Sequence, residues 1–193
     1  MRTIILASAS PRRREILKKT GLTFRVDGGA YDEEMRPGLS PRALARSLSA
    51  AKAEAVAVKY RNAIIIAADT FIVCRKKILG KPHSAEEAKR MLTALNGRSH
   101  SVITGFTIMD TGTNKRISRS AETRVFIKKL SKEEIEAYVR TGEPLDKAGA
   151  YAIQGLGAAL VRKIEGDYFN VMGLPLSELL NALKKFGIHV LHQ

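Results

Sequence analysis

Apolar and polar residues follow one another along the chain in a pattern that predicts strands and helices in turn. Two largely apolar segments, at residues 2–8 and 63–69, are typical of strands covered on both faces. Helices are predicted where apolar residues recur at helical spacing behind a serine or proline start and before a glycine or polar stop. These helices cover residues 10–21, 40–60, 84–95, 131–142 and 174–187. Further strands are predicted at residues 22–26, 97–110, 121–130, 158–166 and 188–191, and residues 70–82 are predicted to form a strand and a tight return.

The order of these elements predicts the fold class. Strands and helices alternate from end to end without internal repeats or low-complexity linkers, and residues 111–115 have the composition of a hairpin turn. An α/β fold with a mixed central sheet and flanking helices follows from that order. We expect one domain over residues 1–193; two lobes around a cleft are compatible with the pattern, although no linker marks a boundary.

Composition narrows the class of partner and the compartment. The chain has 33 Lys and Arg against 19 Asp and Glu, a net charge of +14, which favours an anionic partner. Charge alone does not separate nucleic acid, an acidic membrane surface and free nucleotides. The single cysteine, Cys74, excludes an internal disulfide and fits a reducing compartment. No apolar run approaches the roughly 20 residues of a membrane span, so we expect a cytoplasmic protein without a membrane partner.

The first candidate for a chemical role is the stretch LASASPRRREIL, where a strand gives way to a helix. Ser10 and Pro11 are a good cap and first residue for that helix, which places Arg12 and Arg13 in its first turn. Cations there oppose the helix dipole, and a bound anion would offset this cost. Together with Ser8, these arginines predict a phosphate site at the helix N-terminus. A capped helix with solvated arginines explains the same stretch equally well.

Two further candidates are carboxylates. Asp32, Glu33 and Glu34 lie together in a predicted loop, and Mg²⁺ prefers carboxylate oxygens together with the phosphates of its substrate. A solvated acidic loop is the simpler alternative. Asp69 stands where the second apolar run stops, and ligands in α/β sheets gather beyond the carboxyl ends of strands. It would bind a metal or deprotonate a water there; a turn-forming aspartate is the alternative.

Lysines form the last candidate group. Lys81 lies between a glycine and a proline, and Lys52 lies in the predicted long helix. Next to a polyphosphate each would act as a point charge, whereas a lysine in a tight loop is normally exposed and idle. The chain contains no GxxxxGK[ST] motif, so these lysines do not indicate a P-loop.

Six segments taken together resemble a known family. In chain order they are LASASPRRREIL, AADT, GKP, GRSHSV, DKAGAYAIQGLGA and GDYFNVMGLPL. They are similar to the signature segments of the Maf family of nucleoside triphosphate pyrophosphatases, and the resemblance covers essentially the whole chain. It implies an α/β fold with two lobes around a deep cleft, similar to the inosine triphosphatase group. It also implies hydrolysis of a nucleoside triphosphate to the monophosphate and pyrophosphate with Mg²⁺ or Mn²⁺, a homodimer, and an association with septum formation in bacteria.

The resemblance also assigns roles to individual residues. Asp69 matches the family's proposed proton acceptor, and Glu33 would hold the metal together with it. The positions that match the family's polar substrate-binding residues are Ser8, Arg13, Glu33, Lys52 and Lys81. In this interpretation water attacks the α-phosphorus while Arg12, Arg13, Lys52 and Lys81 neutralise the triphosphate.

Three positions bear on the choice of nucleotide. The family divides into a subgroup preferring dTTP and UTP and one preferring 7-methylguanosine triphosphate, and Arg12, Thr70 and Gln154 match the first. The second usually carries a tryptophan at the first of these places, and this chain has no tryptophan. The amide of Gln154 offers both a donor and an acceptor to a pyrimidine edge.

A rival hypothesis comes from a different class. A basic nucleic-acid-binding or division-regulating protein without catalysis would account for the net charge of +14 more directly than an enzyme does. It explains the acidic loop poorly. The enzyme interpretation expects a small-molecule nucleotide as the partner and no nucleic acid.

Overall fold

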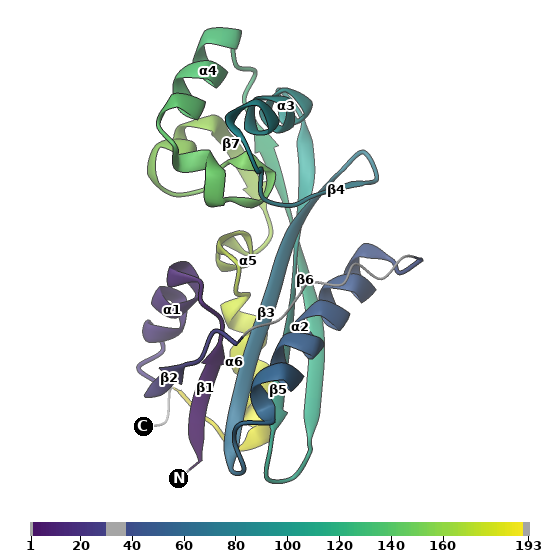
Figure 1. Cartoon of the computed structure of the whole chain (residues 1–193), viewed down its shortest axis with the longest axis vertical. Coiled ribbons are helices and arrows are strands. Elements are labelled where there is room, and N and C mark those ends of the chain that lie inside the picture. Colours follow the sequence, from purple (N-terminus) through teal and green to yellow (C-terminus); the bar gives the residue numbers. More distant parts are fainter. Residues whose placement is uncertain (1, 30–37, 191–193) are drawn as a thin grey trace. The chain divides into compact units, whose positions relative to one another are not determined.

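The computed structural model describes residues 2–29 and 38–190 of the chain (Figure 1). The strands are β1 (Thr3–Ala7), β2 (Phe24–Val26), β3 (Ala63–Cys74), β4 (Lys77–Leu79), β5 (Ser99–Asp110), β6 (Arg116–Ile127) and β7 (Val161–Glu165). The α-helices are α1 (Pro11–Lys18), α2 (Pro41–Ala57), α3 (Ala85–Leu95), α4 (Lys132–Arg140), α5 (Tyr168–Met172) and α6 (Leu176–Leu183). Short 3-10 turns are η1 (Glu143–Asp146), η2 (Ala148–Ala150), η3 (Gly155–Leu160) and η4 (Lys184–Phe186).

The seven strands form one mixed sheet, as the alternating pattern predicts. Their order is β2-β1-β3-β5-β6-β7, and β4 pairs with β3. β1 runs parallel to both β2 and β3, whereas β4 and β7 pair antiparallel with β3 and β6. Within residues 2–29 and 38–190, no helix combines the length and the apolar character that crossing a membrane requires.

Two sequence-based predictions about strands are wrong. The strand predicted at residues 63–69 and the one that opens residues 70–82 are not separate, because β3 continues from Ala63 through Asp69 to Cys74. The tight return predicted within residues 70–82 is confirmed, since β4 pairs antiparallel with β3. The run of β-branched and apolar residues on both sides of Asp69 supports one long strand despite the carboxylate in its middle.

The segment at residues 188–190, predicted as part of a last strand, is not a strand either. Gly187 turns the chain at φ 75°, and the Ile188 N–H then caps α6 by donating to the Leu183 carbonyl at 3.2 Å.

The chain divides into two compact units. Unit 1 comprises Met1–Asp69, Thr104–Ala121 and Gly173–Gln193, and unit 2 comprises Thr70–Ile103 and Glu122–Met172. The divisions fall inside β3, β5 and β6, so these three strands contribute residues to both units. No linker composition marks a division that runs through strands, which is why the sequence pattern gives no boundary.

Small side chains allow close packing in the core of unit 1. Alanines of α2, among them Ala53 and Ala57, pack with Ile5 of β1 and Ile65 of β3. A Cβ on Gly105 of β5 would lie only 2.0 Å from the Ala45 carbonyl oxygen. The helix therefore approaches that strand to a distance that only glycine permits.

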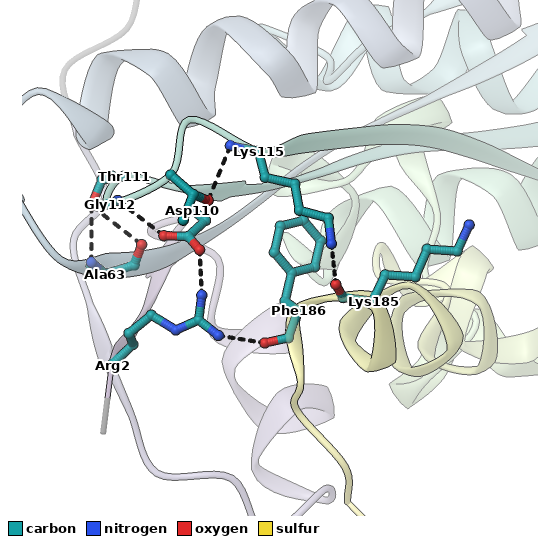
Figure 2. A network of polar contacts seen from close by, with 9 residues as sticks. Arg2, Ala63, Asp110, Thr111, Gly112, Lys115, Lys185 and Phe186 are labelled. Atoms are coloured by element: carbon teal, nitrogen blue, oxygen red, sulfur yellow. Dashed lines mark hydrogen bonds and ion pairs between the residues drawn. The ribbon is translucent and has the colours of Figure 1, made fainter.

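A polar network ties the N-terminus of unit 1 to its C-terminal segment (Figure 2). The Arg2 guanidinium donates to Asp110 at the end of β5 and to the Phe186 carbonyl. Burial raises the pKa of Asp110, but hydrogen bonds from Thr113 and Gly112 and the charge of Arg2 outweigh burial and lower it. The buried Asp110 carboxylate is thus paired with Arg2, whereas an unpaired carboxylate at this position would lower the stability of the fold.

Unit 2 has its own core between its helices and strands. Apolar residues of α3 and α4, including Leu92, Leu95, Ile135 and Val139, pack with Val125 of β6. Cys74 belongs to the same cluster and is 6% exposed, so it is part of the core. A capping box opens α4, where Ser131 and Glu134 bond reciprocally.

Candidate functional site

The N-terminus of α1 holds two of the predicted phosphate ligands in place. Ser10 caps the helix by accepting from the Arg13 N–H at 3.5 Å, and Pro11 is its first residue, as predicted. Buried Ser8 accepts from the Ser10 N–H and from the Arg13 guanidinium, both at 3.2 Å. Arg13 Nε also donates to the Gly173 carbonyl at 2.8 Å. The guanidinium of Arg13 is therefore oriented by the fold.

The charge of this first turn suits an anion. It contains no acidic residue, and Arg12 and Arg13 are half-buried while Arg14 is exposed. Cations at a helix N-terminus oppose the dipole, so an oxyanion bound there would be favoured by both the side chains and the helix.

The second pair of predicted residues forms an ion pair. Lys52 of α2 donates to Asp69 Oδ1 of β3, and the two side chains are 18% and 9% exposed. Exposed ion pairs contribute little to stability, whereas loss of one partner of a sheltered pair such as this one leaves an uncompensated charge. The long apolar face of α2 and the buried run of β3 position these two charges.

Strand register brings the two pairs to the same end of the sheet in unit 1. The parallel pairing of β1 with β3 ends at Ala7 opposite Ala67. Ser8 and Asp69 therefore both lie just past the carboxyl end of this pairing, on strands about 4.8 Å apart. Asp69 does not end its own strand, as the sequence suggested, but it does lie beyond the end of the neighbouring strand. We call Ser8, Arg13, Lys52 and Asp69 the unit 1 cluster.

Three predicted residues belong to unit 2. Thr70 follows Asp69 in β3 and is half-buried, while Lys81 and Gln154 are exposed. The segments that carry the last two are joined, because the Gly149 N–H donates to the Gly80 carbonyl at 2.8 Å. Lys81 and Gln154 thus stand on neighbouring segments of one unit.

The predicted metal site is only partly within the described structure. Glu33, with Asp32 and Glu34, falls outside the described residues. Within the described ranges, no group of three or more His, Cys, Asp or Glu side chains is gathered as a metal site. Asp69 alone still fits Mg²⁺ or Mn²⁺, because such ions are commonly held by one or two carboxylates plus the substrate's phosphates.

Sequence reasoning missed a set of hydrogen-bonded polar residues in unit 2, of which His100, Tyr138 and Tyr151 are buried and Glu143 is half-buried. His100 Nε2 and the Tyr151 hydroxyl are 2.8 Å apart, and burial lowers the pKa of His100 to about 4. Tyr138 bonds to Glu143 at 2.9 Å, and burial, followed by that bond, raises the pKa of Tyr138. Glu143 stands directly after the glycine that ends a helix, where a solvated carboxylate is the ordinary expectation. The spacing of Tyr138 and Glu143 in the sequence gave no indication of their hydrogen bond.

A cavity in unit 1 lies at the opposite end of the strands from the cluster. It has a volume of about 380 Å³ and is lined by Arg2, Ile4, Leu22, Ile64, Gly187, Ile188 and His189. Ile4 and Ile64 stand near the amino ends of β1 and β3. Among the described residues, none of the predicted site residues lines this cavity.

Comparison with known proteins gives full-length matches. A family model described as Maf-like protein matches residues 3–186. The dTTP/UTP pyrophosphatase of Methanosarcina barkeri (strain Fusaro / DSM 804) is 50% identical over 194 residues, which cover 100% of this chain and 98% of the relative. That of Pelotomaculum thermopropionicum is 49% identical over 191 residues, covering 99% and 100%. That of Thermoanaerobacter sp. (strain X514) is 52% identical over 190 residues, covering 97% and 99%.

Proposed function

The chain belongs to the family of Maf-like proteins, and from this membership we propose that it is a nucleoside triphosphate pyrophosphatase acting on dTTP, UTP and related pyrimidine nucleotides. Relatives that share about half of its residues over the full length are named dTTP/UTP pyrophosphatases. The observation that supports the proposal in this molecule is the unit 1 cluster, which consists of the Ser8–Arg13 and Lys52–Asp69 pairs near the carboxyl end of the β1–β3 pairing.

The first task of the cluster is to hold the phosphates. Arg13 presents planar donors to phosphate oxygens, and its bonds to Ser8 and Gly173 reduce the conformational freedom that binding would otherwise cost. Arg12 adds charge on the same helix turn. Lys52 acts as a point charge on the polyphosphate, and Lys81 is proposed from the sequence for the same role.

Its second task is to prepare the attacking water. Asp69 accepts a proton from the water whose oxygen forms a bond to the α-phosphorus. The bond between the α-phosphorus and the oxygen bridging to the β-phosphate then breaks, and pyrophosphate leaves. Lys52 fixes the orientation of the Asp69 carboxylate through their ion pair. Positioning and charge stabilisation are the main needs of such chemistry, and the cluster supplies both.

A divalent cation completes the proposed chemistry. Asp69 would be one ligand of Mg²⁺ or Mn²⁺, and Glu33 is proposed from the sequence as the other. When bound, the ion would neutralise charge on the phosphate oxygens and make the phosphorus a better electrophile. A cytoplasmic location and a homodimer stay predictions.

We propose that Arg12, Thr70 and Gln154 select the nucleotide. The amide of Gln154 would pair with the N3 donor and O4 acceptor of thymine or uracil. Cytosine presents the opposite order at these positions. We therefore expect slower hydrolysis of CTP than of dTTP.

The experiment is a panel of nucleoside triphosphates assayed for released pyrophosphate. With Mg²⁺ or Mn²⁺ we expect dTTP and UTP to be hydrolysed faster than CTP or 7-methylguanosine triphosphate, and a chelator to stop the reaction. Pyrophosphate release from none of them would contradict the proposal.

The net charge of +14 favours one second candidate, a basic nucleic-acid-binding protein. Binding of that kind weakens steeply as salt rises, because it releases counterions. Hydrolysis in a formed site should persist at moderate salt. Strong salt-dependent DNA binding without pyrophosphate release would favour the second candidate.

A further inference from the structure

The segment that carries Gln154 is held by two side chains that lie earlier in the chain. Tyr138 of α4 is 5% exposed, and its hydroxyl accepts from the Ala152 N–H at 3.2 Å. The same hydroxyl donates to Glu143 Oε1 at 2.9 Å. We call the Tyr138 hydroxyl and the Glu143 carboxylate the Tyr138–Glu143 clasp.

The clasp also binds the main chain on the other side of Gln154. Glu143 Oε1 accepts from the Gly157 N–H at 2.8 Å, and its Oε2 accepts from the Leu156 N–H at 3.1 Å. Hydrogen bonds therefore fix the backbone both two residues before and two residues after Gln154.

The clasp caps the N-terminus of η3, a role that the residue at the Gln154 position would usually have. Gln154 is the N-cap of η3, where Ser, Thr, Asp or Asn normally accepts from the following N–H groups. The Gln154 side chain makes no such capping bond and is exposed. Glu143 accepts from those N–H groups instead, so the fold does not use the Gln154 amide as a cap.

The turn is shaped to this carboxylate. Gly155 has φ +65°, and a Cβ there would lie 2.6 Å from Glu143 Oε2. A side chain at this position would be strained by the backbone angle and would push the carboxylate away. The close approach of turn and carboxylate depends on glycine.

Glu143 is held in its charged form. Burial raises its pKa, but the N–H groups of Gly157 and Leu156, the Tyr138 hydroxyl and the charge of Lys147 outweigh burial and lower it. A depressed carboxyl pKa contributes stability above the ordinary glutamate pKa, and this contribution is lost as pH falls through the folded value. The charged clasp is thus complete at neutral pH.

We propose that the Tyr138–Glu143 clasp positions Gln154 for discrimination between thymine or uracil and cytosine, an inference that rests on the base-reading role proposed above. An amide rotated about its last bond exchanges donor and acceptor and then suits cytosine. A fixed main chain limits the positions from which the amide reaches the base, and therefore limits how its donor and acceptor can meet the base. Tyr138 and Glu143 are positioning residues, because they contact the neighbours of Gln154 and not the base.

The test compares kcat/KM for dTTP and CTP in Tyr138→Phe and Glu143→Gln. This ratio does not depend on the fraction of folded enzyme, so a merely structural defect leaves it unchanged. We expect the ratio to fall about tenfold in Glu143→Gln and less in Tyr138→Phe, mainly through a higher KM for dTTP. Tyr138→Phe deletes a single oxygen atom, so the ratio can be measured in this variant if Glu143→Gln does not fold.

Matched controls come from the same unit. Tyr151→Phe removes another buried hydroxyl, the one bonded to His100, and Glu136→Gln changes a carboxylate of α4 that pairs with Lys89. We expect neither to change the ratio, even where Tyr151→Phe lowers the melting temperature. In a Gln154→Ala background, Tyr138→Phe should have no further effect on the ratio, since the clasp acts through Gln154.

The outcomes separate this inference from the proposed function. A lower ratio in Gln154→Ala with an unchanged ratio in both clasp variants would overturn the inference alone. An unchanged ratio in Gln154→Ala would overturn both the base-reading role and the inference. Failure of the unmodified protein to release pyrophosphate from any nucleotide would overturn the proposed function itself.

Discussion

The residues proposed to act on the nucleotide are held differently in the two units. In unit 1, Arg13 bonds directly to Ser8, and Lys52 directly to Asp69. In unit 2, Gln154 is exposed, and its place is fixed through main-chain bonds to the Tyr138–Glu143 clasp. Charged groups can orient one another, because their interaction is strong and long-ranged. A neutral amide that must discriminate between bases needs a rigid backbone instead.

This comparison predicts two kinds of variant. Changes in the unit 1 cluster should slow the hydrolysis of all nucleotides alike, because every triphosphate carries the same phosphates. Changes that disturb Gln154 or the clasp should alter the order of preference among bases. A unit 1 cluster variant that changed the preference among nucleotides without slowing hydrolysis would contradict this distinction between the two units.

The largest effect is expected for Asp69→Asn. Asparagine keeps the shape and an acceptor for Lys52 but does not take the proton, so kcat should fall about a thousandfold for dTTP and UTP alike. Circular dichroism should show an unchanged fold. Glu54→Gln is the control, because that carboxylate pairs with Arg116 on the exposed surface and should retain full activity. Substantial turnover by Asp69→Asn would mean that another group is the base.

A smaller loss is expected for Arg13→Lys. Lysine keeps the charge but cannot reproduce the planar donors that reach Ser8 and Gly173, so kcat/KM should fall about tenfold to a hundredfold for every nucleotide. The matched control is Arg14→Lys, one residue along the same helix and exposed, which should have no effect. Equal losses in the two variants would argue for general charge attraction rather than an oriented guanidinium.

His100→Gln should affect stability rather than hydrolysis. Because burial lowers the pKa of His100 to about 4 from 6.5, the unfolded chain binds a proton between these values that the folded protein does not. The free energy of unfolding therefore falls as pH drops from about 6.5 to about 4, by about 3 kcal/mol in all. Glutamine does not titrate, so urea unfolding should show the stability difference between the two proteins shrinking from about pH 7 to about pH 4.5. A constant difference would show that the pKa of His100 is the same in the folded and the unfolded protein.

The sequence predicted most of the fold, and the Ser10 cap that places Arg13 at the N-terminus of α1, because these features depend on local chemistry. Serine caps, Ser-Pro starts and continuous apolar runs indicated α1, α2, α4 and the mixed sheet, since these signals act within a few residues. The family resemblance supplied Lys52, which no local motif would have connected with Asp69.

The parts that the sequence did not predict depend on contacts between distant residues. Asp69 appeared to end a strand because a carboxylate usually does, yet flanking apolar residues carry β3 through it to Cys74. Glu143 caps a turn more than ten residues away, and only the folded chain brings them together. The expected last strand at Ile188 was replaced by a helix cap, because Gly187 turns the chain back toward α6.

The position of bond cleavage tests the central claim most directly. The protein would hydrolyse dTTP in water enriched in heavy oxygen, and mass spectrometry would locate the label in the products. Attack on the α-phosphorus by a water prepared at Asp69 predicts label in dTMP and none in pyrophosphate. Label in pyrophosphate, or in free phosphate released beside dTDP, would contradict the account.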